Sequence, residues 1–274
     1  MKKIKKSEAR SSRLLEMLQL NRRLDVRTVS ESLGISEATV RRLFARLDGE
    51  GKVIRTHGGV RLAPHLGTDY SYFLSATHRN REKTLLGRAA AELVAAGDRL
   101  YLDSGTTVLK LAEALALRLQ AGQVADVIVL TNSLVLVEAL ARWCKVILVG
   151  GEVRTERRDL CGPISEETLH LFHVTRAFLG ADAIHLSSGF MTTDERTAIL
   201  NRIVLRTAGA ACVLADSEKF NRDSFISYAP LDGVERVLTD ASITEPVLQE
   251  FRAAGAAIEV VPAPARKPAR TEGG

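Results

Sequence analysis

Cysteine, long apolar runs and net charge are all scarce in this sequence of 274 residues, and each scarcity argues against a class of protein. The three cysteines, Cys144, Cys161 and Cys212, are far apart and form no C-x-x-C motif, which argues against a disulfide framework and a zinc cluster. No stretch of about 18 apolar residues could cross a membrane, and no apolar segment follows the basic N-terminus as in a secretory signal. We therefore expect a soluble, cytoplasmic protein that does not bind a membrane.

The low net charge of +5 is unevenly distributed. Residues 1–62 contain 15 Lys and Arg against 7 Asp and Glu, whereas residues 63–274 contain 23 against 26. A basic segment beside a larger, slightly acidic one indicates that the first part meets a polyanion. The alternative is a solvated basic tail, because four of the fifteen cations lie within the first six residues. With 46% hydrophobic residues, the chain is long enough for two packed domains.

The basic segment has the pattern of three short helices followed by a hairpin. Apolar residues at helical spacing predict one helix, then a second that ends at Gly34 and a third that begins at Ser36, whose hydroxyl can cap it. Residues 52–56 alternate as a strand does, and the glycines at 58–59 supply a turn. This order predicts a winged helix-turn-helix DNA-binding domain over residues 1–62.

In that fold the first residues of the third helix face base edges in the major groove, and basic residues nearby reach bases or phosphates. The residues that we expect to contact double-stranded operator DNA are Ser36, Glu37, Thr39, Arg41, Arg42, Arg46, Arg55 and His57. A three-helix bundle whose arginines merely face water is the alternative interpretation.

Short apolar runs alternate with helical stretches over residues 78–262, which is typical of an α/β domain with an open, largely parallel sheet. The first helical stretch spans residues 82–96 and ends at Gly97. The apolar runs lie at residues 99–102, 127–130, 146–149, 177–179, 211–214, 237–238 and 258–261. Residues 63–77 lack periodicity and are interpreted as a linker, and residues 263–274 as a flexible tail.

Small and polar residues follow these runs, at the place where ligands of open α/β sheets bind. Residues 103–107 read DSGTT and lead into a helix, whose free N–H groups favour an anion such as phosphate. Thr131 and Asn132 follow the next run, and Gly150 and Gly151 follow the one after it. Together these residues predict a phosphate-binding site at the strand ends.

Both parts of the sequence contain stretches that occur, in the same order, in one protein family. The stretches of the first part are VSESLGISEATVRR at 29–42, LDGEG at 47–51 and IRTHGG at 54–59. Those of the second part are DSGTT at 103–107, TNS at 131–133, GGEVR at 150–154, GP at 162–163, FLGAD at 178–182 and DSEKF at 216–220. Over about nine-tenths of its length the chain resembles the DeoR family of bacterial transcription regulators. It departs from the family pattern at residues 43–44, Leu-Phe in place of Asp-Leu, and at Thr197, in place of Glu.

The resemblance implies a sensor domain with the fold of ribose-5-phosphate isomerases, glucosamine-6-phosphate deaminases and CoA transferases. It also implies a homo-oligomer, a dimer or a tetramer, that represses a carbohydrate-catabolic operon until a phosphorylated sugar binds. The sequence resembles most the members that regulate amino-sugar and tagatose catabolism. The effector-binding residues that the resemblance implies are Lys83, Asp103, Ser104, Gly105, Thr106, Thr107, Thr131, Asn132, Gly150, Gly151, Asp194, Arg202 and Lys219.

Two other functions stay open at this point: a phosphosugar isomerase or deaminase, and a DNA-binding protein without an effector. Thr197 stands where a carboxylate is expected, and a catalytic domain needs no winged helix, so we expect no enzymatic activity. His170 and His173 have no cysteine or carboxylate fixed beside them, so we expect neither a metal nor a cofactor.

Overall fold

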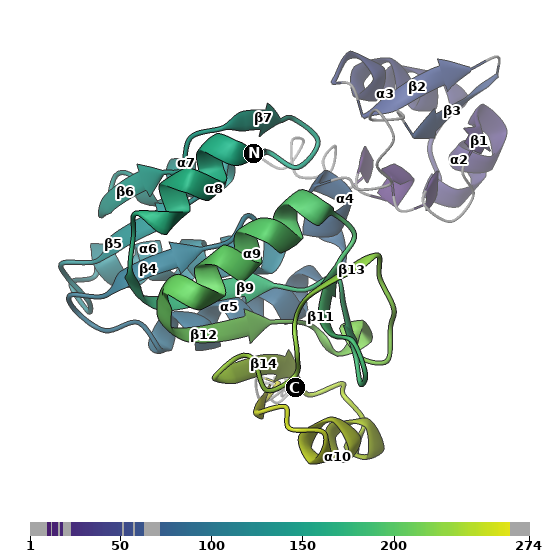
Figure 1. The fold of residues 1–274 in the computed structure, drawn as a ribbon. Coiled ribbons are helices and arrows are strands. Elements are labelled where there is room, and N and C mark those ends of the chain that lie inside the picture. The colour runs from purple at the N-terminus through teal and green to yellow at the C-terminus, as the bar shows by residue number, and fades with distance from the viewer. Residues whose placement is uncertain are drawn as a thin grey trace, which may run out of the picture. The chain divides into compact units, whose positions relative to one another are not determined.

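A computed structural model of the chain describes residues 10–11, 13–15, 17–18, 23–50, 52–56, 58–62 and 72–263 (Figure 1). The chain divides into two compact units, residues 1–78 and residues 79–274. Of the predicted linker, residues 63–71 lie outside the described residues and Tyr72–Thr77 form helix α4. The predicted tail lies outside them from residue 264 onward. Within the described parts of the chain, no helix is both long and apolar enough to cross a membrane.

The first unit contains a helix-turn-helix and a hairpin, as the sequence predicts. Its elements are helical residues between 10 and 18, β1 (Arg23–Asp25), α2 (Val26–Leu33), α3 (Glu37–Gly49), β2 (Val53–Thr56), β3 (Gly59–Leu62) and α4. Strands β2 and β3 form the hairpin, and β1 pairs with β3 to complete an antiparallel sheet of three strands. Buried leucines and valines from the N-terminal helical residues, α2 and α3 form one core.

Local signals explain where the two central helices of this unit begin and end. The Asp25 carboxylate caps α2 by accepting a hydrogen bond from the Thr28 amide at 2.8 Å. Gly34 follows α2 in the left-handed conformation, with φ at 60°. Ser36 then caps α3, which confirms the predicted start of the third helix.

The second unit contains a seven-stranded sheet in which every pair of neighbouring strands is parallel. In spatial order its strands are β15 (Ile258–Val261), β14 (Arg236–Asp240), β12 (Ala208–Leu214), β9 (Val174–Gly180), β4 (Arg99–Leu102), β5 (Ile128–Thr131) and β6 (Lys145–Leu148). Each predicted apolar run overlaps one of these strands, so the prediction of an open α/β domain is confirmed.

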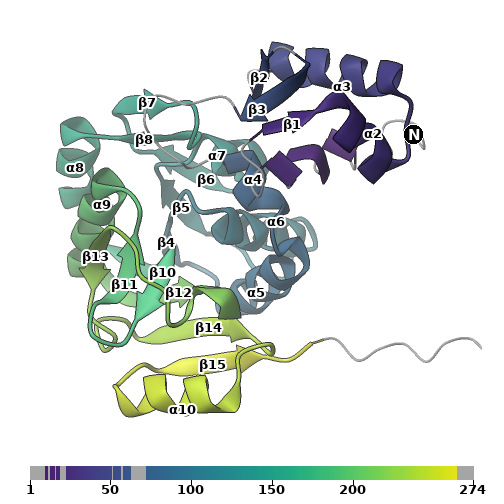
Figure 2. The ribbon, with the colours of Figure 1, turned by 90° about the vertical axis from the view of Figure 1, so that its right-hand side faces the viewer.

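Helices cover both faces of this sheet (Figure 2). The helices are α5 (Asn80–Glu92), α6 (Thr106–Gln120), α7 (Leu134–Leu140), α8 (Pro163–His170), α9 (Glu195–Thr207), α10 (Glu245–Ala253) and the short 3₁₀-helix η1 (Ser217–Lys219). Side chains of α5, α6 and α7 pack with Phe178 on one face, and those of α8, α9 and α10 pack with Ala177 and Leu179 on the other. Successive residues of β9 therefore point to opposite faces, as the pleat of a strand requires.

Two features of the second unit differ from the sequence-based expectation. Helix α5 ends at Glu92, so residues 93–96 lie beyond the helix and the predicted end at Gly97 is wrong by four residues. Five short strands were not predicted, because runs of three or four residues carry too little alternation. They are the hairpin β7 (Glu152–Arg154) with β8 (Asp159–Cys161), and the antiparallel β10 (Ala183–His185), β11 (Gly189–Thr192) and β13 (Ile226–Ala229).

Gly87 lies where α5 packs on α6, and its missing side chain allows the two backbones to touch. A Cβ atom there would lie 2.3 Å from the carbonyl carbon of Lys110. Helix propensity alone favours alanine by about 1 kcal/mol, but this clash costs about 1–3 kcal/mol or more. We expect Gly87→Ala to lower the free energy of unfolding measured in urea. Gly49→Ala, at a helical glycine with nothing within 4 Å, should not lower it. A gain in stability in both variants would contradict the close packing.

Candidate functional site

Helix α3 carries most of the residues that the sequence assigns to DNA binding. The Ser36 hydroxyl accepts a hydrogen bond from the Thr39 amide at 3.4 Å and lies 2.9 Å from the Thr39 hydroxyl. Glu37 and Arg41 form an exposed ion pair of 3.4 Å along the helix. Arg42 is also exposed. The polar start of α3 is therefore fixed by its own cap, and its arginines reach into solvent.

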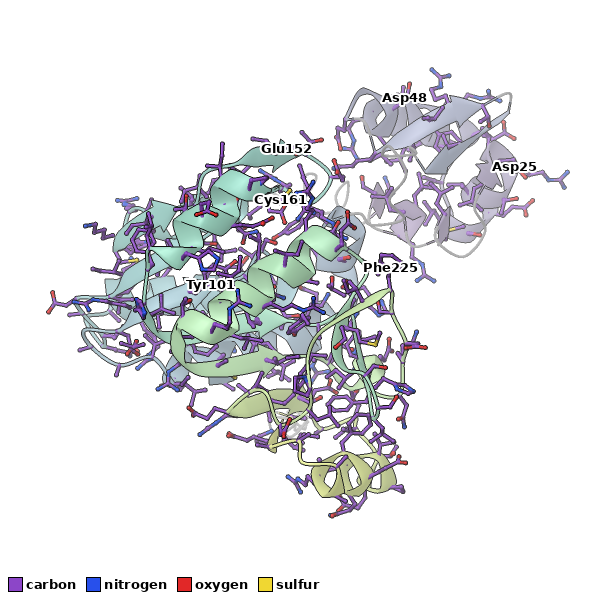
Figure 3. The ribbon with its side chains drawn as sticks, in the orientation of Figure 1. Asp25, Asp48, Tyr101, Glu152, Cys161 and Phe225 are labelled. Atoms are coloured by element: carbon purple, nitrogen blue, oxygen red, sulfur yellow. The ribbon has the colours of Figure 1, made fainter. Side chains whose placement is uncertain are left out.

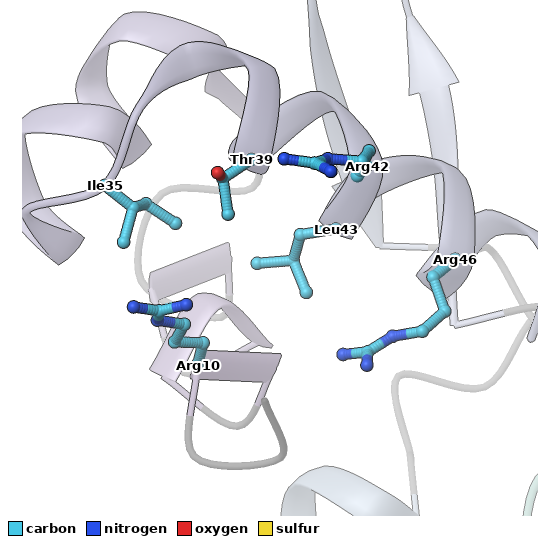
Figure 4. Close-up of a pocket in the computed structure, with 6 residues that line it drawn as sticks. All are labelled: Arg10, Ile35, Thr39, Arg42, Leu43 and Arg46. Atoms are coloured by element: carbon cyan, nitrogen blue, oxygen red, sulfur yellow. The ribbon is translucent and has the colours of Figure 1, made fainter. Parts of the chain in front are cut away.

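The arginines of α3 point to different sides of the helix. Thr39, Arg42 and Arg46 are three and four residues apart, so they share one face. Figure 4 shows them around a pocket beside the N-terminal helical residues. On the wing, Arg55 is exposed on β2 and its amide donates to the Asp48 carboxylate at 3.3 Å. The predicted contact residue His57 lies outside the described residues.

The parallel sheet of the second unit places the predicted effector-binding loops at one edge. Parallel strands end on the same side, so the residues that follow β4, β5, β6, β9, β12 and β14 meet there. The structure thereby brings together segments that are up to about 140 residues apart in the sequence, from Asp103 to Asp240.

The DSGTT loop after β4 is held by its first residue. The buried Asp103 carboxylate accepts hydrogen bonds from the amide of Ser104 at 2.7 Å and from the amide of Gly180 at 3.1 Å. Burial raises the pKa of Asp103 to about 6, against the opposing effect of these two amides. Ser104 in turn donates its hydroxyl proton to Asp159 at 2.8 Å. The loop is thus connected to β9 on one side and to the β7–β8 hairpin on the other.

The N-terminus of α6 contacts one lysine side chain, that of Lys83. Gly105 caps this helix without a side-chain hydrogen bond, and the buried Thr106 and Thr107 form its first turn. The Lys83 ammonium group donates to the Thr106 hydroxyl at 3.0 Å. Burial, together with the charge of Lys219 on η1, lowers the pKa of Lys83 to about 8. Amide groups at a helix N-terminus beside the ammonium group of Lys83 form a site suited to an anion.

Arg154, whose side chain is 10% exposed, holds the other side of the strand ends. Arg154 donates through Nε and Nη2 to the two oxygens of Asp159, both at 2.8 Å, and through Nη1 to Asp194 at 2.6 Å. Asp194 also caps α9, since its carboxylate accepts from the Thr197 amide at 2.8 Å. Although burial raises the pKa of Asp194, hydrogen bonds from Arg154 and the Thr197 amide bring it below its usual value. Asp194 is therefore ionised and fixed in place.

The side chains of Thr131 and Asn132 form hydrogen bonds with other residues of the protein. Thr131 donates to the Leu102 carbonyl at 2.7 Å. Asn132 accepts from the hydroxyl of Tyr101 at 3.2 Å and donates to the Leu160 carbonyl at 3.1 Å. Tyr101, labelled in Figure 3, is fully buried in the sheet. These two residues therefore fix the ends of β4, β5 and β8 relative to one another.

The remaining predicted residues differ in their surroundings. The Gly150 carbonyl accepts a hydrogen bond from Ser165, and a Cβ atom on Gly151 would lie 2.4 Å from the Cys161 carbonyl oxygen. Packing within the protein is thus sufficient reason for glycine at 151. The structure does not bring Arg202 to the strand-end residues through any described contact, because this exposed side chain binds the Ser227 carbonyl of β13.

Comparison with known proteins finds a family match in each of the two units. Residues 10–65 match the DeoR-like helix-turn-helix domain, and residues 78–241 match the DeoR C terminal sensor domain. The chain belongs to the DeoR family of transcription regulators. A relative from Escherichia coli O157:H7, provisionally named aga operon transcriptional repressor, is 30% identical over 95% of each chain. The transcriptional repressor GlcR of Bacillus subtilis strain 168 is 32% identical over 85% of this chain and 88% of its own. A ribose 5-phosphate isomerase from Plasmodium falciparum is 16% identical over 50% of this chain and 52% of its own, with a TM-score of 0.39.

The structure of this DeoR-family regulator adds residues that the sequence did not assign to the site. Arg154 and Asp159 lie in the β7–β8 hairpin, and Tyr228 on β13 donates its hydroxyl proton to the Gly180 carbonyl at 2.7 Å. Arg154 ends the GGEVR stretch, so the motif itself held the signal. Asp159 and Tyr228 had none, because neither follows a predicted strand. In the described parts of the chain, no group of His, Cys, Asp and Glu could hold a metal ion.

Replacing Arg154 with methionine would leave Asp159 and Asp194 buried without the cation that they share. We expect the free energy of unfolding in urea to fall by about 3–5 kcal/mol, because Asp159 loses its ion pair and Asp194 keeps only Arg157, 3.8 Å away. Arg158→Met in the same hairpin is the matched control. It removes a more exposed ion pair to Glu138, of 3.3 Å, and should cost less than about 1 kcal/mol. Equal losses in both variants would show that Arg154 has no special role.

Proposed function

We propose that this regulator represses a carbohydrate-catabolic operon and that a phosphorylated sugar releases it from operator DNA. The observation that carries the ligand class is the anion site at the strand ends. There Lys83 contacts the N-terminus of α6, and Lys219 is near enough to Lys83 for its charge to lower the pKa of that lysine, within a domain of the DeoR sensor type. The names of the two relatives, both repressors, support the direction of regulation.

The two sides of the strand-end site suit the two ends of a sugar phosphate. The phosphate group would lie at the DSGTT loop, where amides of residues 105–107 and the two ammonium groups can bind its oxygens. The sugar would lie toward Asp194 and Ser104, which Arg154 and Asp159 hold in place. Ionised carboxylates have several acceptor positions, so a carboxylate bound to arginine can still accept from a sugar hydroxyl.

Regulation would follow from unequal binding of the sugar phosphate to two states of the protein. A homo-oligomer, a dimer or a tetramer joined through the sensor domain, would present its winged helices to paired half-sites of the operator. If the sugar phosphate binds more tightly to the state that does not fit the operator, its binding lowers DNA affinity. By linkage, bound DNA weakens binding of the sugar phosphate by the same coupling free energy. Repression relieved by the effector is the result.

We further propose that the sensor domain binds its sugar phosphate without converting it. One observation favours an isomerase instead, because a carboxylate whose pKa is about 6 could act as a base at neutral pH, as Asp103 could. Both oxygens of that carboxylate, however, accept backbone amides that shape the loop. Incubating the protein with sugar phosphates and analysing the products decides between the two. Accumulation of an isomerised or deaminated sugar would overturn the assignment as a pure sensor.

Two substitutions should separate DNA binding from effector binding. Arg42→Ala is expected to lower the affinity of the protein for the DNA upstream of its own gene about tenfold or more. It should leave the affinity for the sugar phosphate unchanged. Thr106→Val removes the hydroxyl that Lys83 contacts, so release from DNA should require about tenfold more ligand while DNA affinity is unchanged. Fluorescence anisotropy at fixed salt, with galactosamine 6-phosphate and tagatose phosphates as ligands, measures both. A DNA complex that none of these ligands weakens would contradict control by such sugars.

Binding of a phosphate ester beside Lys83 should be coupled to proton uptake. The pKa of Lys83 is about 8 in the free protein, and a neighbouring dianion raises it. Near pH 8.5 the free lysine is mostly neutral and the bound one mostly charged, so binding should take up roughly half a proton or more. Calorimetry in buffers of different ionisation enthalpy measures this uptake. Lys83→Met should abolish it, and an uptake that persists in this variant would place the titrating group elsewhere.

A further inference from the structure

A pocket beside α3 is not explained by the DNA contacts that the sequence assigns to single residues of this helix. It has a volume of about 210 Å³, and its described lining residues are Arg10, Ile35, Thr39, Arg42, Leu43 and Arg46 (Figure 4). Three of these six are arginines, and none is a carboxylate. Arg10 was not among the residues that the sequence assigned to DNA binding.

The pocket is formed by two helical segments that face each other. Thr39, Arg42 and Arg46 lie along one face of α3, and Arg10 stands on the N-terminal helical segment across from them (Figure 4). Arg46 is also held from both segments, since it binds the Ser11 hydroxyl and lies 3.6 Å from the Glu50 carboxylate. The pocket is therefore a feature of the domain surface, and the buried Leu43 forms its floor.

The positive charge of this pocket favours an anion as its occupant. Three guanidinium groups around one cavity repel one another, and Glu50 lies beside only one of them. Position 43, where the DeoR family pattern has aspartate, holds leucine in this chain, so the described lining offers no carboxylate to the arginines. Guanidinium groups bind phosphate oxygens with paired hydrogen bonds, which makes a phosphate group a matching occupant.

The position of the pocket on α3 indicates which phosphate it meets. The opposite flank of the helix carries Glu37, Arg41 and Asp48, and Asp48 accepts a hydrogen bond from the wing strand β2. The solvent-exposed face of α3 thus lies between the wing and the pocket. A helix in the major groove lies between two sugar–phosphate backbones, about 12 Å apart. The wing then meets one backbone and the pocket meets the other.

We propose that this pocket binds a backbone phosphate of the operator and that Arg10 is a DNA-contact residue. The inference rests on the proposed function, since it requires that α3 enters the major groove. A phosphate contact positions the protein on DNA without reading sequence. Arg10 should therefore contribute equally to operator DNA and to unrelated duplex DNA.

The test compares Arg10→Gln, Arg10→Lys and the wild-type protein on both DNAs over a range of salt concentrations. Loss of one phosphate contact should lower affinity about tenfold on both DNAs. It should also make the slope of log affinity against log salt concentration less negative by about 1. Arg10→Lys keeps the charge and should restore the slope. Arg88→Gln, at an exposed arginine of α5 in the other unit, removes the same charge and should change neither quantity. Thermal unfolding of each variant confirms that it is folded.

Different outcomes overturn different statements. A slope for Arg10→Gln equal to that of Arg88→Gln would overturn the phosphate contact while leaving the proposed function intact. A loss of affinity for the operator alone, with an unchanged slope, would mean that Arg10 reads bases and would also overturn it. A wild-type protein that binds no DNA would instead overturn the proposed function itself.

Discussion

The strand-end site depends on the hydrogen bonds that the guanidinium group of Arg154 donates to Asp159 and Asp194. Loops at the end of a parallel sheet lack the hydrogen bonds that hold the strands, so something else must fix them. Arg154 joins the β7–β8 hairpin to the cap of α9 through Asp159 and Asp194, and Asp159 extends the connection to Ser104 after β4. Three loops of distant sequence origin are thereby held in one arrangement before any ligand arrives.

The anion sites proposed for the two units differ in how their cations are exposed to solvent. In the sensor unit the lysine beside α6 is buried, so its charge is weakly screened and is unfavourable until an anion binds. In the DNA-binding unit the arginines of α3 remain exposed, where salt screens them over about 8–10 Å. A buried site suits selection of one small ligand, and an exposed one suits rapid, reversible association with a long polyanion.

Features with local causes could be predicted from the sequence, and features with distant causes could not. The Ser36 cap and the strand at residues 99–102 follow from neighbouring residues, so both were predicted correctly. The end of α5 was placed too late, because the alanines and valine after Glu92 continue the helical pattern although the helix stops there. The pairing of Arg154 with Asp194 joins residues 40 apart and depends on how the hairpin folds back, which no spacing in the sequence reveals. His57 stays a prediction, since it lies outside the described residues.

The close contact at Gly87 has a consequence for the neighbouring anion site. Lys83 precedes Gly87 by one helical turn on α5, and Thr106 precedes Lys110 by one turn on α6. The backbone contact and the Lys83–Thr106 hydrogen bond are therefore adjacent along the same helix interface. The distance between the ammonium group and the start of α6 is set by how closely the two helices approach. A residue with no functional group, one turn below the proposed site, would thus limit the size of the anion that it can hold.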